Sequence, residues 1–120
     1  MGFVAVSRRA SRDIEAIERY ALENWGPNTA ERYLSAIDFA LQRLRTSPSV
    51  LRSIPRISDH FDFYRVRDHF LVCVRRGDDI YVLAAIHASM DLPTRILELE
   101  PTLLQETELL YKSFLRRKPK

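Results

Sequence analysis

Three histidines, His60, His69 and His87, are the side chains of this sequence best suited to acid–base chemistry near neutral pH. Their neighbours do not show the spacing at which histidines and cysteines share a metal ion, so we expect no metal site and no cofactor. The chain also lacks a G-x-S-x-G turn, a P-loop and a dinucleotide fingerprint, and it has only three glycines from which to build a phosphate cradle. No nucleophile with an adjacent base can be assembled, and we predict no catalytic residue.

His87 ends the stretch YVLAAIHASMD, which is almost wholly apolar up to the histidine. This position admits two interpretations: an active-site residue at the end of a strand, or a residue that hydrogen-bonds a turn where a buried strand meets water. No acidic partner for the ring is obvious beside it, which favours the second interpretation. We therefore interpret His87 as a boundary residue next to a protein-binding groove.

Arginine is the other side chain with binding potential, since the chain has 16 arginines and 3 lysines. Four arginines lie in the predicted strands, namely Arg65, Arg67, Arg75 and Arg76. If Arg65 and Arg67 share a face with Phe61 and Phe63, their guanidinium groups could bind the carboxylates of a protein segment or an RNA backbone. Salt bridges to acidic neighbours at a sheet edge are the competing interpretation.

The net charge of +3 comes from one end of the chain. Four basic residues lie within the last five positions, namely Arg116, Arg117, Lys118 and Lys120. Without them, 15 basic groups stand against 16 acidic ones. A broad phosphate-binding surface normally carries a domain-wide basic excess, so we expect no sequence-specific binding of nucleic acid by this chain alone. We interpret the tail as a solubilising end.

The composition is typical of one soluble domain. The chain has 120 residues, of which 46% are hydrophobic and 29% are charged. No apolar run approaches the roughly 20 residues that cross a bilayer, so we expect a cytoplasmic protein without a membrane partner. The single cysteine, Cys73, lies in the apolar run FLVCV, which excludes an internal disulfide and predicts a buried, inert thiol.

Two helical patterns follow a short strand in FVAVS, with Ser7 or Ser11 as the expected helix cap. Apolar residues recur at spacings of three and four as far as Trp25, where a Gly-Pro pair interrupts the pattern. A second apolar stripe runs from Ala30 to Leu44. Two helices joined by so short a turn should form an antiparallel hairpin, with Trp25 as a core residue at its tip.

Three runs rich in aromatic and branched residues come next and predict an antiparallel meander. They are FDFYRVR (61 to 67), FLVCVRR (70 to 76) and IYVLAAIH (80 to 87). Their connectors, DH and GDD, have hairpin length. The preceding segment, 50 to 58, has room for a short extended piece interrupted by Pro55.

Both faces of this predicted sheet are apolar. In the last strand, strict alternation would place Ile80, Val82, Ala84 and Ile86 on one side and Tyr81, Leu83, Ala85 and His87 on the other. A sheet with one hydrated face should alternate apolar with polar residues, so both faces need a cover. The helix hairpin covers one face, and the second requires the chain's own C-terminal helix, a second copy or a different protein.

Beyond Asp91 the sequence becomes helical again. LPTRILELE predicts a short helix, and Pro101 is expected to open a second one. In this second helix Leu103, Leu104, Thr107, Leu110, Tyr111, Phe114 and Leu115 share a face. We hypothesise that the stripe from Leu103 to Leu115 covers part of the second sheet face. The predicted fold is therefore α+β, a two-layer arrangement of N-terminal strand and helix hairpin on an antiparallel meander, with an extra C-terminal helix.

This order of elements resembles the ParE branch of the RelE/ParE toxin superfamily. The stretch SRRASRDIEAIERYALENWGPNTAERYLSAIDFALQRLRTSP is similar to the family's helix hairpin, with W-G at the bend and A-E-R-Y after it. FYRVRDHFLVCV is similar to the middle strands, and GDDIYVLAAIHASMDLP to the final strand and its His-x-x-Met-Asp end. The resemblance covers Phe3 to Pro93, which suggests a toxin domain at 1–93 and a helical extension with a basic tail at 94–120.

The resemblance implies a two-layer fold with the first strand beside the last, and the toxin half of a type II toxin–antitoxin pair. The implied partners are a ParD-like antitoxin, which lays its C-terminal segment across the toxin, and DNA gyrase, which ParE-type toxins inhibit. An antitoxin or target would contact a set of residues comprising Arg65, Arg67, Arg75, Tyr81, Leu83, His87, Met90 and Asp91.

Two other functions remain open at this point. RelE-type relatives cut messenger RNA on the ribosome, which requires basic and imidazole or hydroxyl groups around the ribose 2′-hydroxyl. Ala84 and Ala85 stand here where many relatives carry an arginine, which disfavours a nuclease. The third possibility is an interaction module that kept the fold without toxicity. Inhibition by binding needs no catalytic signature, so a non-enzymatic gyrase inhibitor is the preferred function.

Overall fold

The computed structural model of the chain describes the backbone of residues 2–117 and the side chains of residues 2–114. The basic tail that we expect at Arg116, Arg117, Lys118 and Lys120 therefore lies outside the described side chains, as does the side chain of Leu115.

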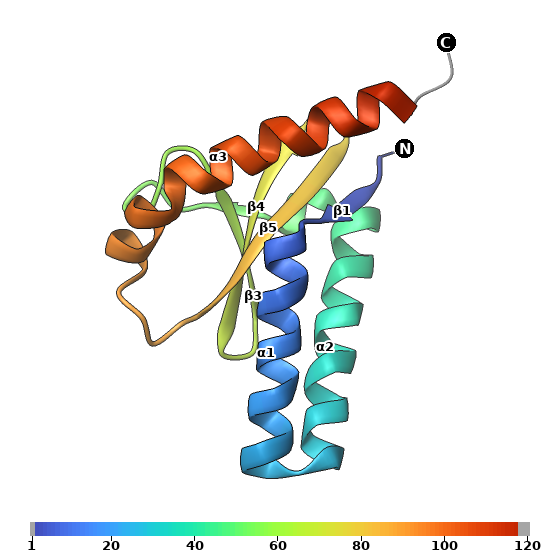
Figure 1. Ribbon diagram of the computed structural model, residues 1–120, viewed down its shortest axis with the longest axis vertical. Helices are drawn as coiled ribbons and strands as arrows, with labels where there is room; N and C mark the ends of the chain where they lie inside the picture. Colours follow the sequence, from blue (N-terminus) through green and yellow to red (C-terminus); the bar gives the residue numbers. More distant parts are fainter. Residues whose placement is uncertain (1, 118–120) are drawn as a thin grey trace.

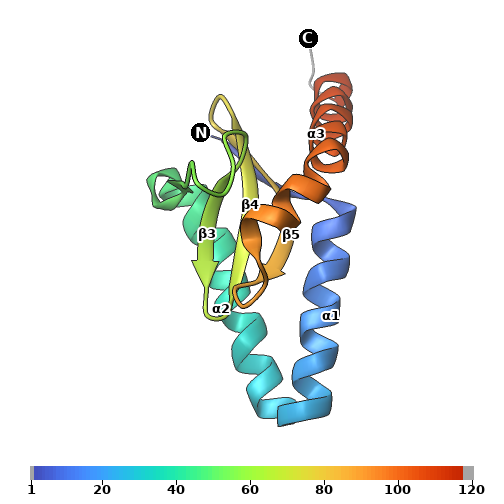
Figure 2. The ribbon, with the colours of Figure 1, turned by 90° about the vertical axis from the view of Figure 1, so that its left-hand side faces the viewer.

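The helix hairpin consists of α1 (Arg8–Trp25) and α2 (Pro27–Thr46). Ser7 is the N-cap of α1, because its Oγ accepts a hydrogen bond of 3.0 Å from the Ala10 amide. Gly26 joins the helices at φ 89°, a conformation that glycine adopts without strain. The expected antiparallel hairpin is confirmed, and its far half extends beyond the end of the sheet (Figures 1 and 2).

A five-stranded mixed sheet packs on this hairpin, with strand order β1-β5-β4-β3-β2. Its strands are β1 (Val4–Val6), β2 (Arg52–Ser53), β3 (Asp62–Val66), β4 (His69–Arg76) and β5 (Asp79–His87). β1 runs parallel to β5, and the remaining pairs are antiparallel. The meander and the pairing of the first strand with the last are confirmed. A 3₁₀ turn, η1 (Pro48–Val50), links α2 to the two-residue edge strand β2.

One sheet face packs against the hairpin. Leu71, Cys73 and Val82 on this face contact buried residues of α1 and α2 such as Ala10 and Ile37. Cys73 is completely buried, and burial raises the pKa of its thiol well above the ordinary value, which keeps it protonated and unreactive. The thiol is inert, as the sequence predicted.

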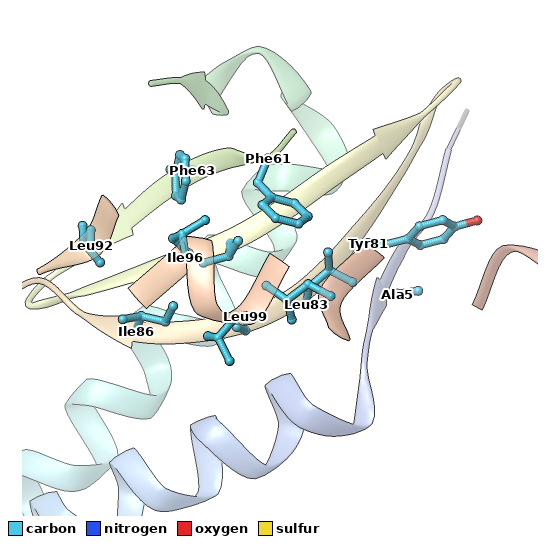
Figure 3. Close-up of a cluster of buried hydrophobic side chains, with 12 residues drawn as sticks. Ala5, Phe61, Phe63, Tyr81, Leu83, Ile86, Leu92, Ile96 and Leu99 are labelled. Carbon is cyan, nitrogen blue, oxygen red and sulfur yellow. The ribbon is translucent and has the colours of Figure 1, made fainter. Parts of the chain in front are cut away.

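The second face is covered by α3 (Leu92–Arg117), the chain's own C-terminal helix (Figure 1). Four fully or nearly fully buried residues of α3 pack on this face, namely Leu92, Ile96, Leu99 and Leu103. Figure 3 shows Leu92, Ile96 and Leu99 of α3 next to Phe63 and Leu83 of the sheet and to Phe61, which precedes β3. Further along α3, Phe114 lies 4.6 Å from Phe3 and stacks on Tyr81, with ring centroids 6.2 Å apart. The hypothesis that the chain covers its own second face is confirmed.

The expected break at Pro101 is wrong, because α3 is one continuous helix with Pro101 inside it. The proline leaves the carbonyl of Leu97 without its usual helical partner. Leu97 is 71% exposed, so this carbonyl lies on the hydrated side of α3. Buried contacts of Leu99 and Leu103 on both sides of Pro101 hold the helix on the sheet through the defect.

Strict alternation along β5 is also wrong, because Leu83 is an extra residue. Val72 pairs with Ala84, whereas Cys73 pairs with Val82, which makes a β-bulge at Leu83. Ala84 and Ile86 consequently lie on the α3 face together with Leu83. The residues after the bulge have changed sides, and the side chain of Ala85 lies on the hairpin face.

Helix α1 supplies the hydrogen bonds that the bulge needs. The Ser7 hydroxyl donates to the Leu83 carbonyl (3.1 Å), and the Ser7 amide donates to the Val82 carbonyl (2.9 Å). The Ala85 amide donates to Oδ2 of Asp13 at 3.0 Å. Two side chains at the start of α1 thus satisfy backbone groups that the irregular ladder would leave unpaired.

Among the described residues, no helix is both long enough and apolar enough to cross a membrane.

We predict that replacing Ser7 with alanine lowers the free energy of unfolding by about 2 to 3 kcal/mol, because it removes a helix cap and strands the buried Leu83 carbonyl. Ser11→Ala provides the matched control, since Ser11 is exposed and makes only an intrahelical backbone bond. Urea unfolding of both variants measures the difference. Equal losses in the two variants would contradict the role assigned to Ser7.

Two leucines of α3 allow a second matched comparison. Leu103 is fully buried against the sheet, and Leu109 is 62% exposed. We expect Leu103→Ala to lower the free energy of unfolding by about 2 to 4 kcal/mol and to increase binding of a hydrophobic dye. Leu109→Ala should change it by less than about 0.5 kcal/mol. If both variants behave like the parent, α3 does not cover the sheet in solution.

Candidate binding cleft

An open cleft of about 630 Å³ lies between the helix hairpin and the end of the sheet. Its walls come from α1, α2, the β3–β4 turn and the end of β5. The lining residues are Asp13, Ala16, Ile17, Tyr20, Trp25, Tyr33, Asp68, His69, Ala85, His87 and Ser89. The β-bulge contributes to this cleft, because without the extra residue Ala85 and His87 would lie on the α3 face.

Tyr33 and His69 are joined by a hydrogen bond of 2.6 Å between the Tyr33 hydroxyl and Nδ1 of His69. The Asp68 amide donates to the same hydroxyl at 3.2 Å. The Tyr33 oxygen therefore accepts from the Asp68 amide, and the Tyr33 hydroxyl donates its hydrogen bond to His69. Nδ1 of His69 is an acceptor in this arrangement, so the neutral ring carries its proton on Nε2.

His87 lies opposite His69 on the neighbouring strand, and the two rings meet edge to face with centroids 4.9 Å apart. Nδ1 of His87 accepts from the Ser89 amide (3.0 Å) and contacts the Ser89 hydroxyl (2.6 Å). The neutral His87 ring thus also has its proton on Nε2. The interpretation of His87 as a strand-end residue that hydrogen-bonds a turn is confirmed.

Burial shifts the pKa values of two acid–base groups of the cleft, His69 and Asp13, toward their neutral forms. Burial and, to a smaller extent, the nearby His87 lower the pKa of His69 to about 4, against the opposing effect of Asp68. Burial raises the pKa of Asp13, and this shift is opposed by the Ala85 amide and by Arg9 and Arg95. His69 is therefore a neutral hydrogen-bonding group at pH 7 and a weak base.

Aromatic rings form the outer wall of the cleft. Tyr20 is 57% exposed and Trp25 is 53% exposed, and their rings meet edge to face at 5.3 Å. The prediction that Trp25 is a core residue is therefore wrong. The reason is that the hairpin extends beyond the sheet, so no described helix or strand packs over its tip (Figure 2). Two large exposed rings beside a cleft are typical of a protein contact surface.

Arg65 and Arg67 do not share a face of the sheet. A shared face was the condition under which we expected the two guanidinium groups to bind one partner together. Arg65 lies over the Phe70 ring (5.5 Å) and donates from Nε to the Arg67 carbonyl (2.8 Å). Arg67 occupies the β3–β4 turn at φ 52° and lies over the Tyr33 ring at 5.8 Å. The turn separates the two guanidinium groups, and only Arg67 is near the cleft.

The remaining predicted contact residues are dispersed. Arg75 is exposed on β4 opposite Ile80, and Met90 is 48% exposed in the turn after β5. The carboxylate of Asp91 accepts from the Thr94 amide (3.4 Å) and from the Thr94 hydroxyl (2.9 Å) at the start of α3. Tyr81 and Leu83 are 1% and 0% exposed beneath α3, so a partner could reach them only if α3 moved away.

Sequence reasoning missed Asp13, Tyr20, Tyr33 and His69 as cleft residues. Tyr33 and His69 are 36 positions apart, and only the packing of α2 on the sheet brings them together. Tyr20 belonged to no apolar stripe, which was a usable signal of exposure.

The cleft offers groups for hydrogen bonding and for apolar contact. Within the described part of the chain, no group of three or more histidine, cysteine or acidic residues could hold a metal ion. The cleft presents aromatic rings, carboxylates and the Nε2–H donors of the neutral imidazole rings. These groups are suited to contact with a protein side chain.

Comparison with known proteins places these features in a family context. The sequence model described as ParE toxin of type II toxin–antitoxin system, parDE, matches residues 4–92. A curated protein from Escherichia coli named Toxin ParE is 26% identical over 92 residues, which cover 76% of this chain and 89% of that protein. The solved structure of a chromosomal ParDE toxin–antitoxin system from P. aeruginosa has the same fold. It superposes with a TM-score of 0.65 at 16% identity, covering 74% of this chain and 98% of that one.

The environment of His69 predicts a specific loss of stability in acid. Below its ordinary pKa of 6.5 the unfolded chain binds a proton at His69, whereas the folded chain resists protonation down to about pH 4. Stability contributed by this residue should therefore fall between pH 6.5 and about 4. The variant His69→Asn keeps an acceptor near the position of Nδ1. We expect it to remove about 1 to 2 kcal/mol of the pH dependence of the free energy of unfolding, which is less than the full pKa shift would give because His69 is only partly buried.

The comparison requires urea unfolding at pH 7.5 and 4.5 for the parent, for His69→Asn and for the control His60→Asn. His60 has a side chain that is 55% exposed and lies outside the cleft. A pH dependence that is identical in the parent and His69→Asn would refute the buried, neutral state of His69.

Proposed function

The chain belongs to the ParE toxin family of type II toxin–antitoxin systems, and from this premise we propose that it inhibits DNA gyrase by binding and is neutralised by a ParD-like antitoxin. The observation that carries the proposal is the family match over residues 4–92, which includes the whole helix hairpin and all five strands. An action on gyrase would take place in the cytoplasm, which is the location that we propose.

The chemistry of the cleft supports inhibition by binding over the RelE-type cleavage of messenger RNA. A nuclease needs a base that accepts a proton near pH 7, but burial holds the pKa of His69 at about 4. The Nδ1 atoms of His69 and His87 are both occupied by internal hydrogen bonds. These contacts rigidify the two rings, which suits a preorganised contact surface.

We propose that the accessible contact surface comprises the aromatic wall of the cleft and its rim. Tyr20 and Trp25 provide apolar area. His87 also lines the cleft, and the exposed Met90 lies just beyond it. Aromatic residues of this kind are the usual anchors of protein interfaces. Arg67 would add a positive charge at the rim, above Tyr33.

We further propose that residues 94–120 are an addition to the toxin domain at 1–93. The family match ends at residue 92, where α3 begins. Because α3 covers Tyr81 and Leu83, an antitoxin segment that contacts these residues would have to displace it. An antitoxin that binds at the cleft would leave α3 in place.

Inhibition of supercoiling by purified gyrase tests the proposed function. We expect the full chain to inhibit supercoiling and Trp25→Ala to weaken the inhibition about tenfold, since it removes one of the two large exposed rings of the cleft wall. Phe39→Ala is the matched control, because Phe39 is 63% exposed on α2 and lies outside the cleft. This control should inhibit like the parent.

A parallel assay follows cleavage of a translated message by the same protein. Cleavage without inhibition of gyrase would replace the proposal with the RelE-type function. Inactivity in both assays would favour an interaction module without toxicity.

A further inference from the structure

A second pocket, of about 470 Å³, lies at the edge of the sheet formed by β2 and β3, away from the cleft. Three of its lining residues are arginines that come from different elements: Arg43 from the last turn of α2, Arg52 from β2 and Arg65 from β3. Its remaining lining residues are Ser49, Val50, Ile54, Phe63, Tyr64 and Phe70. Among the described residues, no acidic one lines this pocket, which therefore carries a concentrated positive charge with apolar walls.

The three guanidinium groups have no acidic partner in the described part of the chain. Other arginines do have one: Arg76 pairs with Glu108, Arg95 pairs with Glu98 at 3.4 Å and Arg9 approaches Asp13 at 3.9 Å. No such pair involves the arginines of the pocket among the residues described. Since the body of the chain is nearly neutral, three arginines without a carboxylate concentrate positive charge at one place.

Beyond β2, the edge of β3 beside this pocket has no strand partner among the described residues. β2 has only two residues, which pair with Phe63 and Asp62. From Tyr64 to Val66, β3 pairs with β4 on one side, and no described strand pairs with it on the other. An open strand edge offers backbone donors and acceptors to an incoming extended segment.

The pairing also places two of the arginines on one face. Arg52 lies opposite Phe63, so its side chain points to the same face as Phe63. Arg65 is two residues further along β3 and points the same way. Its position over Phe70, a residue packed against the α3-side cluster, agrees with this placement.

We propose that this edge is the docking site of an acidic, extended segment of a partner protein, which pairs with β3 beyond β2 and places its carboxylates on Arg52 and Arg65, while Arg43 adds positive charge to the wall of the same pocket. The inference rests on the proposed function in one respect, because the antitoxin is the partner that would carry such a segment. Side chains at alternate positions of the added strand would face the arginines, and apolar residues between them would contact the walls of the pocket.

The observations favour a peptide over a nucleic acid. A strand edge forms its ladder of hydrogen bonds only with another polypeptide backbone. The exposed side of the Phe70 ring is already occupied by Arg65, which removes a platform on which a base could stack. Three arginines are also few for a phosphate-tracking surface on a nearly neutral body.

Two-dimensional NMR of the full-length protein tests this inference, because it detects binding even in the millimolar range. The probe is a capped VEVEVEV peptide, with VQVQVQV as its uncharged control and hexauridylate as the nucleic-acid probe. We expect VEVEVEV to shift the backbone amides of residues 64–66 and the Nε–H signals of Arg52 and Arg65. VQVQVQV should bind at least about tenfold more weakly, since charge-assisted hydrogen bonds to guanidinium supply much of the affinity.

The double variant Arg52→Gln, Arg65→Gln should weaken VEVEVEV binding about tenfold or more while its spectrum remains that of a folded protein. Arg75→Gln is the matched control, because Arg75 is an exposed strand arginine that does not line the pocket. Equal binding of the two peptides, unchanged binding by the double variant, or shifts located elsewhere would overturn the proposal. Tighter binding of hexauridylate through the same arginines would also overturn it, in favour of a nucleic-acid site.

Gyrase inhibition by the same double variant separates this inference from the proposed function. Inhibition equal to that of the parent, together with lost peptide binding, supports a docking edge distinct from the gyrase contact. If the parent does not inhibit gyrase but binds VEVEVEV at the β3 edge, the proposed function fails and the docking site stands.

Discussion

The hydrogen bonds between the start of α1 and the β-bulge at Leu83 determine which side chains of β5 face which layer. Before the bulge, even-numbered residues of β5 face the hairpin and odd-numbered residues face α3. After it, the two sets exchange sides, so Ile86 packs beneath α3 and Ala85 faces the hairpin. The side chains of Ser7, the N-cap of α1, and of Asp13 in α1 form hydrogen bonds with the backbone of Leu83 and Ala85 at the bulge. The same contacts therefore position the cleft residue His87 and hold α1 on the sheet.

The covering of both sheet faces has a consequence for any partner. Tyr81 and Leu83 lie in the second core with α3, and at about 25 cal/mol per Å² their exposure would be costly. A partner that uses this face must replace the apolar contacts of α3. The cleft and the β3 edge require no such exchange, because their arginines, exposed aromatic rings and hydrogen-bonding groups already face solvent.

Charge is distributed unevenly over the described molecule. Around the cleft, carboxylates and arginines offset one another: Arg9 and Arg95 act on Asp13, and Arg67 lies beside Tyr33 and Asp68. Arg76 is similarly balanced by Glu108 of α3, and it also lies over the Tyr111 ring. The pocket at β2 and β3 has no such balance. Electrostatic complementarity contributes mainly to partner selection and association rate, which is consistent with a docking role for this edge.

Much of the architecture could be predicted from local patterns. The spacing of apolar residues predicted α1 and α2, and the turn between them required a hairpin. Alternating runs with short connectors predicted β3, β4 and β5, and the apolar character of both strand faces predicted the cover that α3 provides. These predictions held because each depends on residues close together in the chain.

Other features depend on groups that are distant in the sequence. A one-residue bulge leaves no trace in a strand that is apolar on both sides, and it was Ser7 and Asp13 of α1 that accommodated it. The exposure of Trp25 depends on the hairpin extending beyond the sheet, and the continuity of α3 through Pro101 depends on buried contacts on both sides of the proline. The sequence by itself thus determined the elements and the need to bury two faces, since periodicity is a local property. Only the tertiary structure decided which polar groups meet, because Tyr33 with His69, and Arg43 with Arg65, become neighbours through packing alone.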